Sequence, residues 1–119
     1  MGLTILYAED TKLVADAVRG LLEHEGWTVE VCADGHAAMN KLAGGPRYGL
    51  LLLDNELPGA TGLELTRYAR SLITYRRTPI IILSATDCGV EARRAGADLF
   101  LIKPEGIMEL LGAVRRLTE

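Results

Sequence analysis

Five polar side chains follow short apolar segments of this sequence, and their types suggest metal and phosphate chemistry. They are Glu9 and Asp10 after residues 3–8, Asp54 after 50–53, Ser84 after 80–83 and Lys103 after 99–102. Carboxylates that lie close together repel one another and need a cation at neutral pH. Oxygen ligands without His or Cys favour Mg²⁺, which readily takes a phosphate as a further ligand. A lysine and a hydroxyl could hold that same phosphate.

The pattern of apolar residues predicts alternating strands and helices that would position these side chains. Strands are expected at residues 3–8, 27–32, 50–53, 80–83 and 99–102. Helices are expected before Gly26, over about 35–42, from Thr61 onward, before Gly96 and over 107–117. The second helix should break at Gly44-Gly45-Pro46.

Two of the expected helices carry more specific signals. The first should bury one apolar stripe, formed by Leu13, Val14, Ala17, Val18, Leu21 and Leu22. The third should begin at Thr61, because Thr61 and Glu64 have the spacing of a capping box. In the last helix the stripe is formed by Ile107, Leu110, Leu111, Val114 and Leu117.

Alternating strands and helices predict an α/β fold with one parallel sheet covered by helices on both faces. The wholly apolar segments 50–53 and 80–83 suit the middle of the sheet, and the alternating segment 27–32 suits an edge. This pattern is compatible with the doubly wound strand order 2-1-3-4-5, in which ligands bind at the carboxyl ends of the strands. Asp54 would end the central strand, so it is the best candidate for a nucleophile that forms an acyl phosphate.

Length and composition fit a single domain over residues 1–119, since domains most often have ~100–150 residues. With 49% hydrophobic and 24% charged residues, the chain is not intrinsically disordered. The net charge of −3 argues against a free-standing nucleic-acid binder, and no apolar run approaches the ~20 residues of a membrane span. Cys32 and Cys88 form neither a zinc box nor a disulfide framework, so we expect reduced thiols and a cytoplasmic location.

In this order the strand-end residues resemble the receiver domains of two-component response regulators, over essentially the whole chain. The resemblance rests on Glu9-Asp10, on the run Asp54-Asn55-Glu56-Leu57-Pro58 with Gly62 after it, on Ser84-Ala85 and on Lys103-Pro104. It implies a CheY-like (βα)5 fold, Mg²⁺ as cofactor and a phosphorylation-dependent switch. Such a module is not an enzyme beyond self-phosphorylation from small donors and slow autodephosphorylation.

The resemblance also implies a metal site around the phosphoacceptor. Asp54 would accept the phosphoryl group, and it would bind Mg²⁺ together with Asp10 and the backbone carbonyl of Glu56. Glu9 would hold the metal through water.

The remaining site residues would handle the phosphoryl group and transmit its presence. Lys103 would pair with the phosphoryl oxygens, Ser84 would hydrogen-bond one of them, and the small Ala85 would leave the group room to enter. Phe100 would turn inward behind Ser84 in the switched state. The peptide bond between Lys103 and Pro104 would be cis.

The implied phosphate donor is a histidine kinase or a phosphotransfer protein. The output would be read by another protein, or by an effector domain outside this chain, through a face formed by the fourth helix, the fifth strand and the fifth helix. The same face could pair two copies in a dimer. The domain itself would contact neither nucleic acid nor membrane.

The sequence departs from the family pattern at four places. The segment between Ser84 and Lys103 is about three residues shorter than usual, and Phe100 stands where Tyr is commoner. A further departure is Glu105, which follows Lys103-Pro104 where an aromatic is frequent, and Glu56 adds a fourth acid near the phosphate. Two alternatives stay open: a pseudo-receiver that binds partners without being phosphorylated, and, ranked lower, a Mg²⁺-dependent phosphatase with Asp54 as nucleophile. A flavodoxin-like cofactor carrier is disfavoured, because acids occupy the loop where it needs a phosphate-binding turn.

Overall fold

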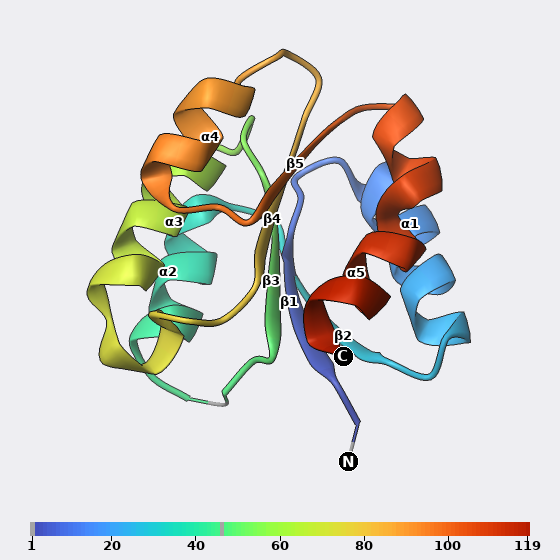
Figure 1. Ribbon diagram of the computed structural model, residues 1–119, viewed down its shortest axis with the longest axis horizontal. Coiled ribbons are helices and arrows are strands. Elements are labelled where there is room, and N and C mark those ends of the chain that lie inside the picture. The colour runs from blue at the N-terminus through green and yellow to red at the C-terminus, as the bar shows by residue number, and fades with distance from the viewer. Residues whose placement is uncertain (1, 46) are drawn as a thin grey trace.

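The computed structural model describes residues 2–45 and 47–119, and within them five strands alternate with five α-helices (Figure 1). The strands are β1 (Thr4–Ala8), β2 (Thr28–Cys32), β3 (Leu50–Asp54), β4 (Ile80–Ser84) and β5 (Leu99–Ile102). The helices are α1 (Lys12–His24), α2 (Gly35–Ala43), α3 (Gly62–Ser71), α4 (Gly89–Ala95) and α5 (Leu110–Thr118). Short 3₁₀ turns lie at Ile73–Tyr75 and Glu105–Glu109. Pro46, part of the break predicted after the second helix, lies outside the described residues.

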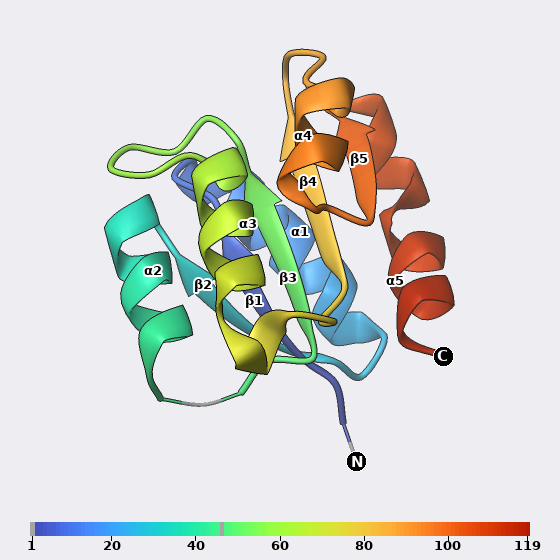
Figure 2. The ribbon, with the colours of Figure 1, turned by 60° about the vertical axis from the view of Figure 1, so that its left-hand side comes forward.

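The strands form one parallel sheet in the order β2-β1-β3-β4-β5, which confirms the predicted α/β topology. Figure 2 shows β3 between β1 and β4, in the middle of the sheet. Every residue of β3 and β4 is buried, because helices cover both faces of the parallel sheet, and the polar residues Asp54 and Ser84 stand only at the last position of each strand. Because all strands are parallel, the residues that end β1, β3, β4 and β5 all lie at the carboxyl end of the sheet.

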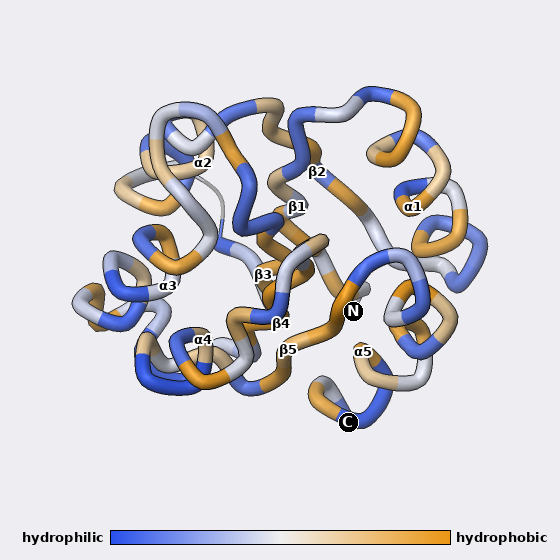
Figure 3. The backbone as a smooth tube through the Cα atoms, turned by 90° about the horizontal axis from the view of Figure 1, so that it is seen from above, coloured by the Kyte–Doolittle hydropathy of each residue, from blue (hydrophilic) through white to orange (hydrophobic). Residues whose placement is uncertain are grey.

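Helices α1 and α5 cover one face of the sheet, and α2, α3 and α4 cover the other, as the end-on view in Figure 3 shows. Each face has its own apolar core. Successive strand residues point to opposite faces, so Ile5 and Tyr7 pack toward α1 and α5 while Leu6 and Ala8 pack toward the other side. The sheet is therefore packed against an apolar core on both faces, up to the strand ends where the polar residues begin.

Helix α1 buries a narrower stripe than the sequence predicts. Its buried residues are Ala15, Val18 and Leu22. The assignment of Leu13, Ala17 and Leu21 to the stripe was wrong: Leu13 is 82% exposed, Leu21 is 45% exposed and Ala17 is exposed. These three residues are four apart and form a neighbouring row on the helix surface, which the sheet does not reach.

The start of α3 is fixed by the capping box that the sequence predicts. The Thr61 hydroxyl oxygen accepts a hydrogen bond from the backbone N–H of Glu64 at 3.1 Å, and the Glu64 carboxylate accepts one from the N–H of Thr61 at 2.9 Å. The next residue, Gly62, packs so closely on β3 that a Cβ atom there would lie 2.7 Å from the carbonyl oxygen of Asp54. The loop between β3 and α3 is thereby held against the end of the central strand.

The last α-helix begins later than predicted, at Leu110, and Ile107 belongs to the preceding 3₁₀ turn. That turn brings Gly106 against β5, where an added Cβ would lie 2.7 Å from the Cβ of Leu101. Only a residue without a side chain fits at this point of the turn. Among the described residues, no helix is long and apolar enough to cross a membrane.

The burial pattern of α1 predicts a large difference between two leucines of the same helix. Leu22 is fully buried, so Leu22→Ala should lower the free energy of unfolding by about 2–5 kcal/mol. Leu13→Ala removes the same atoms from a side chain that is 82% exposed, and it should change stability by less than about 0.5 kcal/mol. Urea denaturation of the two variants measures both values, and equal losses would contradict the observed orientation of α1.

Candidate functional site

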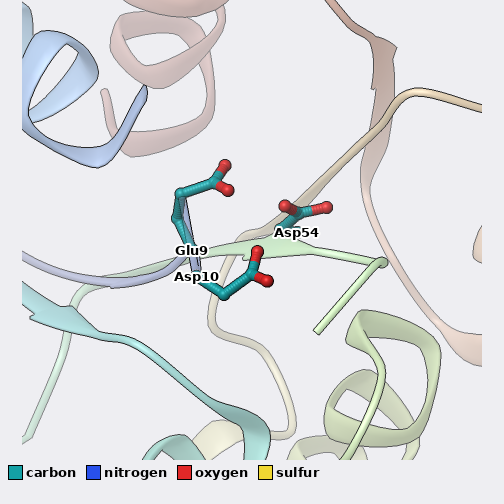
Figure 4. Close-up of side chains that lie close together, drawn as sticks. All are labelled: Glu9, Asp10 and Asp54. Carbon is teal, nitrogen blue, oxygen red and sulfur yellow. The ribbon is translucent and has the colours of Figure 1, made fainter. Parts of the chain in front are cut away.

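The carboxyl ends of β1 and β3 bring three carboxylates together. Glu9 and Asp10 directly follow β1, Asp54 is the last residue of β3, and Figure 4 shows the three side chains beside one another. One carboxylate oxygen from each lies within 4.8 Å of the others. Glu9 and Asp54 are each only 2% exposed, whereas Asp10 is exposed. The cluster is thus set into the end of the sheet and reaches solvent at Asp10.

Lys103 supplies positive charge to this cluster from the end of β5. Its Nζ lies 2.9 Å from Oδ2 of Asp54 and 3.0 Å from Oε1 of Glu9. Its backbone N–H donates to the carbonyl oxygen of Ser84 at 2.8 Å, which keeps the residue attached to β4 while its side chain reaches across to β3. The Lys103–Pro104 peptide bond is cis.

The surroundings of Asp54 shift the pKa of its carboxyl group in opposite directions. Burial raises the pKa of the Asp54 carboxyl above its ordinary value, and the neighbouring Glu9 raises it further. Hydrogen bonds from Lys103 and from the backbone N–H of Glu56, which lies 3.0 Å from Oδ1, oppose this shift but do not cancel it. For Lys103, burial lowers the pKa, but the hydrogen bonds and charges of Asp54 and Glu9 outweigh burial and raise it. The Lys103 ammonium thus pairs with two of the three clustered carboxylates, and negative charge is in excess.

The donor set fits Mg²⁺. The three residues of the cluster offer only carboxylate oxygens, which are hard ligands, and no His or Cys belongs to it. A divalent cation bound there would offset the excess negative charge. The structure thus brings Glu9, Asp10 and Asp54 together as the strand order predicts, and their chemistry agrees with the predicted cofactor.

A second set of contacts joins the loop after β3 to the end of β4. The buried Ser84 hydroxyl donates to one carboxylate oxygen of Glu56, and the backbone N–H of Ala85 donates to the other at 2.9 Å. The N–H of Thr86 donates to the Ser84 oxygen at 3.1 Å. The family resemblance implies that the Ser84 hydroxyl bonds a phosphoryl oxygen, whereas in this structure its acceptor is the Glu56 side chain.

Sequence reasoning missed Tyr7 as part of the site. Its hydroxyl lies 3.4 Å from Oε1 of Glu9, and burial, together with the charges of Glu9 and Asp54, raises its pKa. The hydroxyl therefore stays protonated and donates to the buried carboxylate. Tyr7 stands two residues before Glu9, and the period of two along a strand was the signal that could have placed both on one side.

Phe100 lies apart from the acids, on the face of the sheet that α4 covers. It is half-buried against the core under α2, α3 and α4, and a Cβ atom at Gly89 would lie 3.3 Å from its ring. With residues of α4 and the turn after it, Phe100 lines a surface cavity of about 600 Å³. Phe100 belongs to β5 and lies next to α4, two of the elements expected to form the output face.

Comparison with known proteins gives a family match over nearly the whole chain. The model of the response regulator receiver domain matches residues 5–115. The response regulator ArlR of Staphylococcus epidermidis is 40% identical over 114 residues, which cover 93% of this chain and 50% of ArlR. The chain thus spans about half the length of the curated relatives it matches.

Solved receiver structures have the same fold and extend the match to the metal. The receiver domain of the sensor histidine kinase PA1611 from Pseudomonas aeruginosa has a magnesium ion coordinated in its active site cleft. It is 31% identical with a TM-score of 0.88, and the match covers 99% of this chain and 98% of that one. TrrA of Thermotoga maritima, solved in complex with Mg²⁺ and BeF, is 28% identical with a TM-score of 0.84, over 97% and 98% of the two chains.

The electrostatics of the cluster predict that Asp54→Asn stabilises the metal-free protein. Because folding raises the pKa of Asp54, the ionised carboxyl disfavours the folded state above that pKa, and this cost disappears below the ordinary value of 3.8. With a chelator at pH 7, the substitution should raise the melting temperature by a few degrees, and the gain should shrink as the pH falls through the raised pKa. Asp16→Asn, an exposed residue of α1, is the matched control and should have little effect. A lower melting temperature for Asp54→Asn would contradict this account.

The donor set also predicts that Mg²⁺ stabilises the folded protein. A ligand that binds only the folded state at one hundred times its Kd adds about 2.7 kcal/mol. Adding Mg²⁺ should therefore raise the melting temperature of the unaltered protein, and Asp10→Asn, which removes the exposed carboxylate of the cluster, should abolish most of the rise. Differential scanning calorimetry with and without Mg²⁺ measures both. Equal responses of the two proteins would place the metal elsewhere.

Proposed function

This chain belongs to the response regulator receiver domains, and we propose that its Asp54 is the residue that accepts the phosphoryl group from a histidine kinase. A receiver domain is a phosphoacceptor signalling module of a two-component system, and the pocket of Glu9, Asp10 and Asp54 is its acidic site. The observation that carries the proposal is the position of Asp54. It ends the central strand, lies beside the carboxylates of Glu9 and Asp10, and has the ammonium of Lys103 at 2.9 Å.

The proposed reaction is a transfer from nitrogen to oxygen. A carboxylate oxygen of Asp54 attacks the phosphorus of a phosphohistidine, and an O–P bond forms as the P–N bond breaks. The electron pair of the broken bond stays on the imidazole nitrogen, which takes up a proton, and Asp54 becomes an acyl phosphate. Lys103 provides a positive charge beside the group being transferred.

The chain's own groups are arranged to hold the metal that such a transfer uses. Asp10, Asp54 and the backbone carbonyl of Glu56 would bind Mg²⁺ directly, with Glu9 holding it through water. When bound, Mg²⁺ would neutralise negative charge on the phosphoryl oxygens. Tyr7 supports this set, since its hydroxyl donates to Glu9 and orients that carboxylate.

We propose that the added charge is read at the end of β4 and passed to the face formed by α4, β5 and α5. A phosphoryl group brings about −1.5 to −2 charge and strong acceptor oxygens, for which the Ser84 hydroxyl and Lys103 are the nearby donors. Phe100 lies beside α4 and lines the cavity there, so a shift at the end of β4 can repack it. A partner protein, an effector domain or a second copy would read the altered face. This signalling would take place in the cytoplasm, on the face of the membrane where histidine kinases present their phosphohistidine.

Phosphorylation from a small donor tests the role of Asp54 directly. Incubation with acetyl phosphate and Mg²⁺ should add one phosphoryl group, seen by intact mass, because the carboxylate, the lysine and the metal ligands all belong to this chain. Asp54→Asn and a chelator should each abolish the addition, while Asp16→Asn should leave it unchanged. Phosphate on the Asp54→Asn variant would assign the nucleophile to another residue, and no addition to the unaltered protein would favour a pseudo-receiver.

A further inference from the structure

The Glu56 carboxylate occupies two hydrogen-bond donors at the end of β4. One of its oxygens accepts from the Ser84 hydroxyl and the other accepts from the backbone N–H of Ala85 at 2.9 Å. Ser84 is fully buried, and its oxygen in turn accepts from the N–H of Thr86 at 3.1 Å. These donors are oriented by the backbone of the β4–α4 loop, and in this structure an acidic side chain satisfies them.

A carboxylate and a phosphoryl group present the same chemistry to such donors. Each offers anionic oxygens that accept charge-assisted hydrogen bonds from an O–H and an N–H. The backbone N–H of Glu56 is itself bonded to Oδ1 of Asp54 at 3.0 Å, so the side chain starts beside the phosphoacceptor and extends to Ser84. Glu56 thus holds by its side chain two donors at the carboxyl end of β4, the strand that pairs with β3 beside Asp54.

The side chain is free to leave these donors. Glu56 is an exposed residue, so its carboxylate can leave the two donors and be hydrated by solvent instead. A dianionic phosphoryl group on Asp54 would repel the carboxylate and compete for Ser84 and Ala85. Release therefore costs two hydrogen bonds to a charged group and needs no rearrangement of the buried core.

We propose that Glu56 acts as an internal gate for the phosphoryl group. In the unphosphorylated protein its carboxylate holds the Ser84 and Ala85 donors, and phosphorylation of Asp54 displaces it. Because the phosphoryl group must displace the Glu56 carboxylate, the gate lowers the affinity of the site for that group. When the carboxylate leaves, the loop after β3 loses these two hydrogen bonds to the end of β4 and the loop after it. This inference deepens the proposed function and rests on Asp54 as the phosphoacceptor.

Binding of beryllofluoride, a tetrahedral analogue of the phosphoryl group, tests the gate. At saturating Mg²⁺, Glu56→Ala should lower the Kd for beryllofluoride by about tenfold, since the ligand no longer displaces two hydrogen bonds to a charged group. Glu56→Asp keeps the charge but is one methylene shorter, so it cannot bridge both donors and should also bind more tightly. Glu105→Gln removes the charge of an exposed acid soon after Lys103 and should leave the Kd unchanged. Fluorine NMR measures the bound fraction, and the melting temperature of each variant establishes that it is folded.

The amide resonance of Ala85 provides a second readout that does not depend on the ligand. In the free protein, Glu56→Ala and Glu56→Asp should shift this resonance and speed its hydrogen exchange, because the N–H loses its carboxylate acceptor. Equal Kd values for all variants would overturn the gate. Tighter binding by Glu56→Ala alone would also overturn it, since charge repulsion would then explain the effect. Failure of every protein, the unaltered one included, to bind beryllofluoride would instead reject Asp54 as the phosphoacceptor, and the gate with it.

Discussion

Two buried carboxylates at the end of a parallel sheet are the constraint on which this structure depends. Glu9 and Asp54 are almost fully enclosed, and buried charges are stable only where an opposite charge and hydrogen bonds compensate them. Lys103 provides that compensation from β5, two strands away from Asp54, with Nζ within 3.0 Å of both carboxylates. Lys103 does not neutralise the whole cluster, because the cluster contains three carboxylates and Lys103 brings one positive charge. The remaining negative charge favours binding of a cation, which can in turn bind phosphate.

Beside this charged centre, the Glu56 side chain links the loop that follows β3 to the end of β4 and the loop after it by hydrogen bonds. The capping box of α3 and the close contact of Gly62 with Asp54 hold the first loop in place. The Glu56 carboxylate then reaches Ser84 and Ala85 on the second loop. A switch needs an element with two discrete arrangements, and a solvent-exposed acid on two oriented donors is such an element, because a stronger anion can take its place.

The sequence predicted the strands to within about one residue at each end. Continuous apolar segments in an α/β chain are buried on both sides, and the middle of a sheet covered by helices provides that environment. The helices were less well defined. Helix α1 carries leucines on two adjacent rows, and periodicity cannot tell which row faces the sheet; packing buried Leu22 and left Leu13 in solvent. The 3₁₀ turn before α5 packs Gly106 against Leu101, a contact between different elements that leaves no periodic signal in the sequence.

By itself the sequence determined the order of strands and helices, the acids that gather at one edge and the ligand chemistry of that edge. These follow from local patterns: apolar runs, glycine and capping signals, and the residue type that directly succeeds each strand. Only the tertiary structure decided which partner each polar group has. Lys103 bonds to Glu9 as well as Asp54, and Ser84 donates to Glu56, across distances in sequence that no periodicity spans. Hydrogen bonds depend on ångström-scale positions of atoms from separate strands, and those positions exist only once the sheet has assembled.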